Sequence, residues 1–186
     1  MDGKPKLNIL SMAQIAVCSA LLCVSAFIVV PVPIISVPFT LQVLVVVMTA
    51  LILKPSEALT AQFIYTLLGV IGLPVFSGGQ GGIGVIFSPT GGFIIGFIFA
   101  SFIISFIKGK NENILRYIIV TTLVGIPIIY SFGVGFYMMF TGADFFTAIA
   151  SVASVFIAVD IIKCVAASFI AIAVRKALKR ANTGYN

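Results

Sequence analysis

The chain has 186 residues, of which 61% are hydrophobic and 9% are charged, and its mean hydropathy is +1.25. A soluble domain is about 45–50% apolar and about 25% charged, so this composition argues against soluble enzymes, secreted scaffolds and disordered chains and predicts an integral membrane protein. The net charge of +6 could suggest nucleic acid, but the positions of the cations explain it differently.

Apolar runs of about 20 residues, the length that crosses a bilayer, recur along the chain between turn signals. We therefore expect an all-α membrane protein whose residues 1–186 form a single domain of six transmembrane helices. The predicted spans cover about residues 7–30, 39–53, 55–72, 89–107, 114–140 and 145–174.

Local signals mark the ends of three of the predicted spans. The first stops at Pro31, and the third begins at Pro55, because proline is tolerated at the first helical position. Glu57 then suits the positive end of the helix dipole. Ser88 is expected to be the N-cap of the fourth span and Pro89 its first residue.

The last two spans carry signs of irregular geometry. The fifth contains three glycines and a proline, so we expect it to be kinked or broken (Gly125, Pro127, Gly133, Gly135). The sixth would reach about 45 Å at 1.5 Å per residue, which is longer than the bilayer core, so we expect it to tilt.

The cations predict the orientation. Ten of the eleven Lys and Arg residues fall at the N-terminus, between spans two and three, in or beside the connection between spans four and five, or after span six, and Lys163 is the exception. This distribution predicts cytoplasmic termini and outer connections free of cations. The cluster Arg175, Lys176, Lys179 and Arg180 is interpreted as an anchor beside anionic lipid, so nucleic acid is not needed to explain the basic charge.

The N-terminus has a second interpretation, a cleaved signal peptide. Lys4 and Lys6 precede an apolar run and the small-residue stretch Val24-Ser25-Ala26. The apolar run continues to Val30, however, which is longer than the hydrophobic region of a usual signal peptide. We therefore expect a retained membrane span.

The residues offer little for catalysis. Histidine is absent, the cysteines lack the spacing of metal ligands, and no G-x-x-x-x-G-K-[ST] motif occurs. We therefore expect no enzyme activity, no metal and no cofactor, and the chain cannot power transport with ATP alone.

Asp160 and Lys163 are the only charges deep inside a predicted span. Each costs about 2.5–3.5 kcal/mol at the bilayer centre, so an intramembrane pair requires a reason. At i and i+3 they share a helix face, where they either orient the last helix as an ion pair or form a ligand site. We favour the ligand site, because a carboxylate beside an ammonium complements a compact neutral solute with N–H and C=O groups, such as a cyclic urea.

Other polar residues could complete such a pocket from the outer side. Ten of the seventeen glycines lie between Gly69 and Gly96, which predicts a lid or cavity wall, although a flexible exposed loop is an alternative. The N-terminus of the fourth span could attract an anion through its free N–H groups. The candidates, besides the ion pair, are Gln42, Ser77, Gly79, Gln80, Thr90, Gly91 and Gly92.

The first span carries a small-residue face that includes Ala16 and Ala20. Such a face lets a second helix approach closely. It serves either packing within this chain or contact with a partner, and the sequence leaves both possibilities open.

Four segments together resemble the BioY family, the biotin-specific S components of energy-coupling-factor (ECF) transporters. The resemblance spans essentially the whole chain, and the segments occur in order. They are Val-Pro-Phe-Thr-Leu-Gln at 37–42, Gly-Leu-Pro-Val-Phe at 72–76 with its glycine-rich tail, Ser-Pro-Thr-Gly-Gly at 88–92, and Asp160-x-x-Lys163.

The resemblance implies a six-helix subunit in the plasma membrane of a prokaryote that captures biotin from outside. It also implies as partners a transmembrane coupling subunit and two ABC-type ATPases. Asp160 and Lys163 would bind the ureido ring, and Ala16 and Ala20 would face the coupling subunit. Some members carry a basic residue where this chain has Phe93, so the fourth span's N-terminus or Gln42 would hold the biotin carboxylate.

Two other functions remain possible from the residues. One is an S component or stand-alone carrier for another small vitamin with a ring amide. The other is a small ion channel that uses Asp160, which is disfavoured because Lys163 would oppose cation passage.

Overall fold

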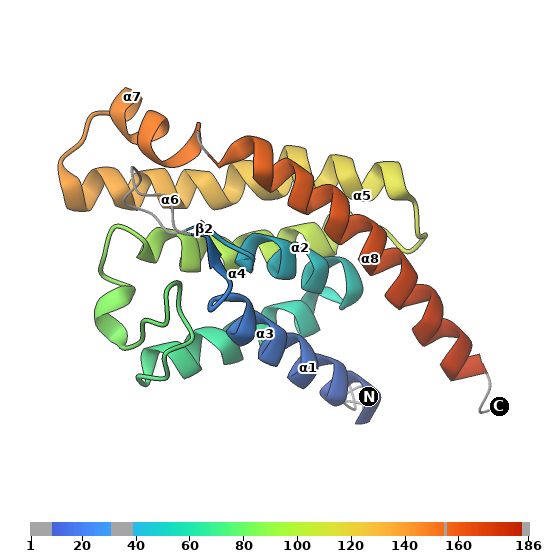
Figure 1. Cartoon of the computed structure of the whole chain (residues 1–186). Coiled ribbons are helices and arrows are strands. Elements are labelled where there is room, and N and C mark those ends of the chain that lie inside the picture. The colour runs from blue at the N-terminus through green and yellow to red at the C-terminus, as the bar shows by residue number, and fades with distance from the viewer. Residues whose placement is uncertain (1–8, 31–38, 155, 184–186) are drawn as a thin grey trace, which may run out of the picture.

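The computed structural model describes residues 9–30, 39–154 and 156–183, and this part of the chain is mostly helical (Figure 1). Two short strands, β1 (Val29–Val30) and β2 (Phe39–Thr40), pair antiparallel. The α-helices are α1 (Ile9–Ser25), α2 (Gln42–Ile52), α3 (Pro55–Val70), α4 (Gly91–Ile107), α5 (Ile114–Val120), α6 (Ile126–Thr141), α7 (Phe145–Ala148) and α8 (Ile157–Thr183). The structure also contains one 3-10 turn, η1 (Ile83–Val85), and two π-helical segments, η2 (Thr121–Gly125) and η3 (Ile149–Ala153).

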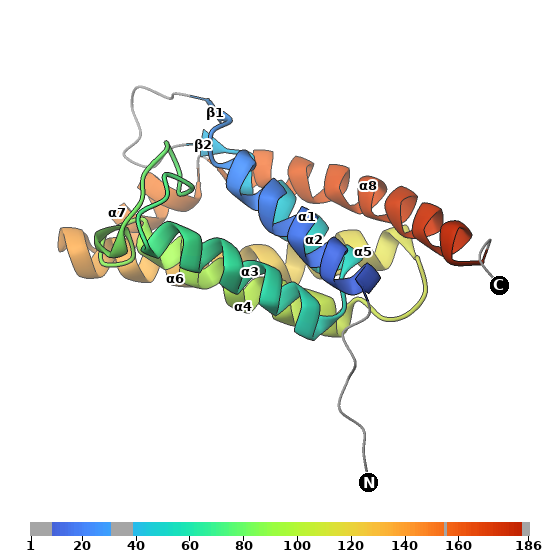
Figure 2. The same ribbon diagram turned by 90° about the horizontal axis from the view of Figure 1, so that it is seen from below.

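The helices lie alongside one another, with α4 packed against α2, α3 and α6. The helix α2 also packs on α8, and α1 packs on α3. Figures 1 and 2 show that α1 begins and α8 ends at the same end of the bundle, here called the terminal end. The opposite end, the loop end, holds β1, β2, α7 and the loop 71–90 between α3 and α4.

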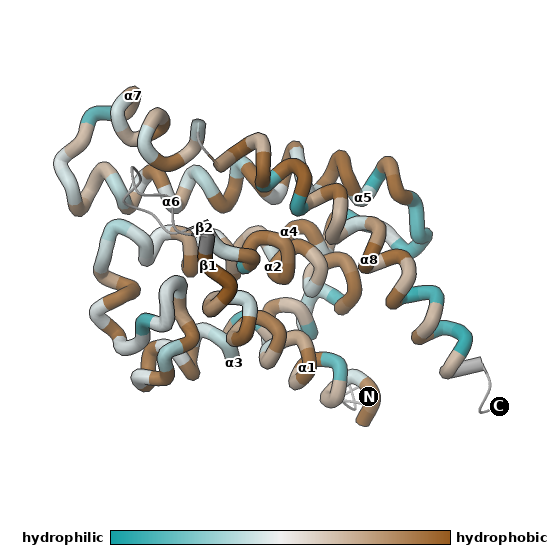
Figure 3. The backbone as a smooth tube through the Cα atoms, viewed as in Figure 1, coloured by the Kyte–Doolittle hydropathy of each residue, from teal (hydrophilic) through white to brown (hydrophobic). Residues whose placement is uncertain are grey.

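Apolar side chains cover the outside of the bundle as well as its core. Phe106 and Phe146 are 74% and 82% exposed, and many other large apolar residues are exposed on the helices. Hydrophilic residues concentrate toward the C-terminal part of α8 (Figure 3). Two helical segments, Ile114–Thr141 and Ile157–Ala181, are long and apolar enough to cross a membrane. Such a surface is typical of a protein surrounded by lipid.

Two predicted helix ends are wrong. The first helix ends at Ser25 instead of continuing to Val30, because residues 29–30 pair with β2. The N-cap of α4 is Thr90 and not Ser88, and Gly91 is its first residue. The Ser88 hydroxyl instead donates to the Val85 carbonyl, within the turn that leads to the helix.

The structure shows where the last two predicted spans depart from a regular α-helix. Residues 114–141 form one helical run that is not broken but contains the π-helical segment η2 just before Pro127. Proline lacks an N–H and clashes with the preceding turn, which explains the irregular backbone there. The expected single helix over residues 145–174 is instead interrupted between Ala153 and Ile157, and α8 continues to Thr183.

Candidate functional site

Asp160 and Lys163 form a buried ion pair in the first two turns of α8. The Lys163 Nζ lies 2.7 Å from Asp160 Oδ1, and the two residues are only 6% and 4% exposed, respectively. The same Nζ donates to the backbone carbonyl of Thr40 in β2 at 2.8 Å. Buried charges are tolerated when they are paired and hydrogen-bonded, and this pair meets both conditions.

Tyr130 in α6 completes the coordination of the carboxylate. Its hydroxyl donates to Asp160 Oδ2 at 2.6 Å, so both oxygens of Asp160 accept hydrogen bonds. Tyr130 was not among the predicted site residues. Its only signal was a phenol within an apolar run, which is as typical of packing as of a site.

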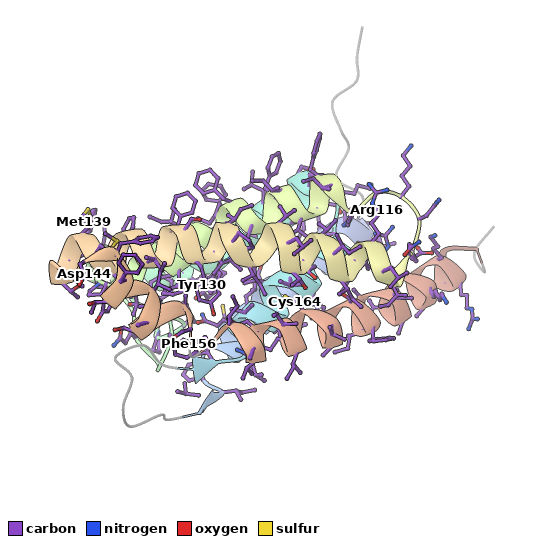
Figure 4. All side chains as sticks on the ribbon, turned by 90° about the horizontal axis from the view of Figure 1, so that it is seen from above. Arg116, Tyr130, Met139, Asp144, Phe156 and Cys164 are labelled. Carbon is purple, nitrogen blue, oxygen red and sulfur yellow. The ribbon has the colours of Figure 1, made fainter. Side chains whose placement is uncertain are left out.

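The ion pair lies in the wall of a small cavity near the loop end that is partly open to the outside. Segments far apart in the sequence supply its walls. In Figure 4, Tyr130 in α6 and Phe156 just before α8 lie close to each other. The lining residues are Thr40, Gln42, Val43, Ser77, Thr90, Phe93, Phe97, Tyr130, Phe156, Asp160 and Lys163.

Three further predicted site residues line this cavity, namely Gln42, Ser77 and Thr90. The Gln42 amide donates to the Tyr65 hydroxyl at 2.5 Å and accepts from the Thr40 hydroxyl at 3.2 Å. The Ser77 hydroxyl is buried and has no hydrogen-bond partner among the described residues. It is therefore the polar group of the wall that most needs an external partner.

Four other predicted residues are not among those that line the cavity. Gln80 is exposed, and Gly79 is partly buried in the loop. Gly91 and Gly92 are buried where a Cβ would overlap the backbone oxygens of Ile86 and Phe132, respectively. Their absent side chains thus allow close packing of α4, and a ligand-binding role for these four residues stays a prediction.

The glycine-rich loop is packed onto the bundle. Phe76 is fully buried against Gly69 and forms an edge-to-face contact with Tyr65, with ring centroids 5.7 Å apart. Gly78 and Gly79 have φ values of +73° and +76°, which side chains rarely adopt, and Gly78 N–H donates to the Ala26 carbonyl. The loop therefore forms a cavity wall, with Ser77 on its inner side.

The alanines of α1 face outward. Ala16 and Ala20 are exposed, whereas Cys18 and Ser19 are buried, and the Ser19 hydroxyl donates to the Ala61 carbonyl of α3. Within the described residues, the alanine face is therefore not used for packing inside the chain. It is accessible to a partner helix.

Comparisons with known proteins all point to the same protein family. The family model described as the BioY family matches residues 2–180. The biotin transporter BioY of Thermotoga maritima is 39% identical, over 85% of this chain and 91% of that protein. Biotin transporter BioY2 of Lactococcus lactis is 36% identical, over 92% of this chain and 93% of that protein.

A solved structure agrees with these sequence relatives. The crystal structure of the S-component for biotin from an ECF-type ABC transporter matches with a TM-score of 0.83 and 27% identity. The match covers 94% of this chain and 95% of that one. By sequence and by fold, the chain belongs to the BioY family.

Proposed function

We propose that this chain is the membrane subunit that captures biotin from outside the cell for ATP-driven uptake by an ECF transporter. The observation that carries the proposal is a buried carboxylate and ammonium, 2.7 Å apart, in the wall of an internal cavity. The ring urea of biotin has two N–H donors and one carbonyl acceptor. It matches an acid that accepts and an amine that donates.

The network around the pair can admit the urea without being dismantled. A carboxylate oxygen accepts more than one hydrogen bond, so a urea N–H can be added at Asp160 while Tyr130 and Lys163 stay in place. The apolar rings of Phe93, Phe97 and Phe156 would then enclose the rest of the bicycle. A site that is formed before the ligand arrives loses less entropy on binding.

The proposed arrangement in the membrane has six spanning segments. The helices α1 to α4 provide four of them, α5–η2–α6 the fifth, and α7–η3–α8 the sixth. The terminal end, which holds cations such as Lys108 and Arg175, would face the cytoplasm of a prokaryote, and the loop end would face outward. Positive-inside bias supports this orientation.

The chain would act with partners that supply energy. The exposed alanines Ala16 and Ala20 would contact the ECF coupling subunit, because small residues allow close helix approach. Two ABC-type ATPases would use the ATP, so this subunit would need no cofactor of its own.

Direct binding tests the proposal. The protein is stripped of ligand in detergent and titrated with biotin by calorimetry, with native mass spectrometry to count bound molecules. We expect saturable binding of one biotin per chain. Absence of saturable binding by well-folded protein would overturn the proposal. If another vitamin with a ring amide, and not biotin, raises the melting temperature in a thermal-shift panel, that vitamin is the ligand.

A further inference from the structure

We infer, resting on the proposed function, that the pocket does not recognise the carboxylate of biotin and therefore binds biotin amides as well as the free acid. Biotin has a ring urea at one end and a carboxylate at the end of a flexible chain. The urea has partners in Asp160 and Lys163. The charges around the cavity decide what happens to the carboxylate.

The described part of the chain places no second cation at the cavity. Of its eleven Lys and Arg residues, Lys163 alone lies between Arg116 and Arg175, and residues 7–53 and 55–107 contain none. The cations of the described residues, Lys163 apart, lie at the terminal end, where Figure 4 labels Arg116. Among the residues that the structure describes, Lys163 is the only lysine or arginine that lines the cavity.

Lys163 itself is already neutralised. Its Nζ contacts Asp160 at 2.7 Å and the Thr40 carbonyl at 2.8 Å, so it does not present an excess positive charge to the cavity. The other charge at the loop end is negative, because Asp144 caps α7 there (Figure 4). The loop end thus has no net positive charge to attract a carboxylate.

The N-terminus of α4 is the remaining electropositive feature, and its first amides are partly engaged. Gly91 N–H donates to the Ser88 carbonyl at 3.0 Å, and Phe93 N–H donates to the Thr90 carbonyl at 3.1 Å. The ring of Phe93 fills the adjacent wall and packs edge-to-face on Tyr130, with centroids 6.1 Å apart. An aromatic ring, and not a hydrogen-bond donor, is thus the side chain that this turn of α4 contributes to the cavity wall.

A buried carboxylate without a cation is strongly unfavourable, so the chain end of bound biotin would remain in contact with water. The Ser77 hydroxyl is neutral and can bond an amide as readily as a carboxylate. Conversion of the carboxylate to an amide then removes no ionic contact. The substrate class is biotin with either a charged or a neutral chain end.

The test compares biotin with biotinamide in calorimetric titrations of the ligand-stripped protein in detergent. We expect dissociation constants that agree within about threefold, since no charge-assisted bond is lost. A loss of about tenfold or more for biotinamide would overturn the inference while the proposed function stands. Absence of biotin binding would overturn both.

A pair of variants at one position gives a second readout. Phe93→Arg places a cation in the wall and should create a preference of at least about tenfold for the free acid over the amide. The matched variant Phe93→Leu keeps an apolar wall and should show no preference. An existing preference for the acid in Phe93→Leu would contradict the inference even if the arginine variant failed to fold.

Discussion

The two ends of the bundle use buried lysines in different ways. At the loop end, Lys163 is 6% exposed and lines a cavity with Asp160. At the terminal end, Lys108 is 5% exposed and donates to the carbonyls of Ala50 and Leu53 at the end of α2. Burial of a cation is therefore not by itself evidence of a ligand site, and the adjoining cavity makes the difference.

The helix α2 connects the two ends. Its first residue, Gln42, lines the cavity, whereas the carbonyls around its last turn accept from Lys108 and Arg175. Cations near a helix C-terminus satisfy its free carbonyls and the negative end of its dipole. The terminal end thus holds α2 in place, while the loop end faces the solute.

The largest effect is expected from a surface that belongs to neither end. Ala16→Trp or Ala20→Trp should abolish ATP-driven biotin uptake by cells that also express the ECF module, because a large ring prevents close approach of a partner helix. Biotin binding by the purified variants should be unchanged. Uptake of labelled biotin and calorimetry measure the two properties.

Leu115→Trp in α5, at a position that is 68% exposed, is the control for an added indole ring. It should transport normally. Normal uptake by both alanine variants would show that the face formed by Ala16 and Ala20 has no role in coupling.

The next largest effect is expected from substitution of Lys163, and substitution of Lys108 provides the direct comparison. Lys163→Ala, like Asp160→Asn, should weaken biotin binding at least about tenfold, because a lost hydrogen bond to a charged group costs about 1.5–3 kcal/mol. Lys108→Ala removes a lysine of similar burial and should lower the melting temperature without changing the dissociation constant. Calorimetry and a thermal-shift assay on the same samples provide the comparison. Unchanged affinity in both cavity variants would assign the ion pair to structure alone.

A smaller effect is expected at Tyr130. Tyr130→Phe keeps the ring but removes the donor to Asp160 Oδ2, so the carboxylate is less firmly oriented. We expect biotin affinity to fall about 3- to 10-fold, in line with the cost of one hydrogen bond. The matched variant Tyr117→Phe removes a buried hydroxyl that has no hydrogen-bond partner among the described residues, and it should leave affinity unchanged. Equal affinities of the two variants would exclude a positioning role for Tyr130.

The sequence was sufficient for properties that depend on local composition and spacing. Apolar runs indicated helices in a membrane, and the i and i+3 spacing of Asp160 and Lys163 predicted that they share a face. Tyr130 and the Thr40 carbonyl could not be predicted in the same way. Tyr130 is 30 positions from Asp160 in the sequence, and Thr40 is 123 positions from Lys163. Contacts between residues so far apart depend on how the helices pack.

The errors at helix ends also arise from contacts that the local sequence pattern does not show. A serine followed by proline is a common start for a helix, but α4 begins at Gly91 because the preceding turn engages Ser88 with Val85. The interruption before α8 also had no marker, since no proline lies between Thr141 and Asp160. Nevertheless, it brings Phe156 to the cavity wall, so it matters for the site.

The smallest effect is expected from an ion-pair network at the terminal end. Glu112 contacts Lys179 at 2.6 Å and Arg175 at 3.5 Å. The hydrogen bond from Lys179 and the nearby cations lower the pKa of Glu112 below its ordinary value of 4.5. Because Lys179 is largely exposed, Glu112→Gln should lower the melting temperature by only about 1–3 °C at neutral pH and leave biotin affinity unchanged.

The pH dependence separates this charge effect from a packing effect. A carboxylate whose folded pKa is depressed stabilises the protein fully above its unfolded pKa, and this contribution is lost as the pH falls through the folded pKa. The difference in melting temperature between wild type and Glu112→Gln should therefore be constant from pH 7 to about pH 5 and should shrink below about pH 4. A difference that persists at the lowest pH would indicate that Glu112 acts through packing, and a change in biotin affinity would show that the two ends of the bundle are coupled.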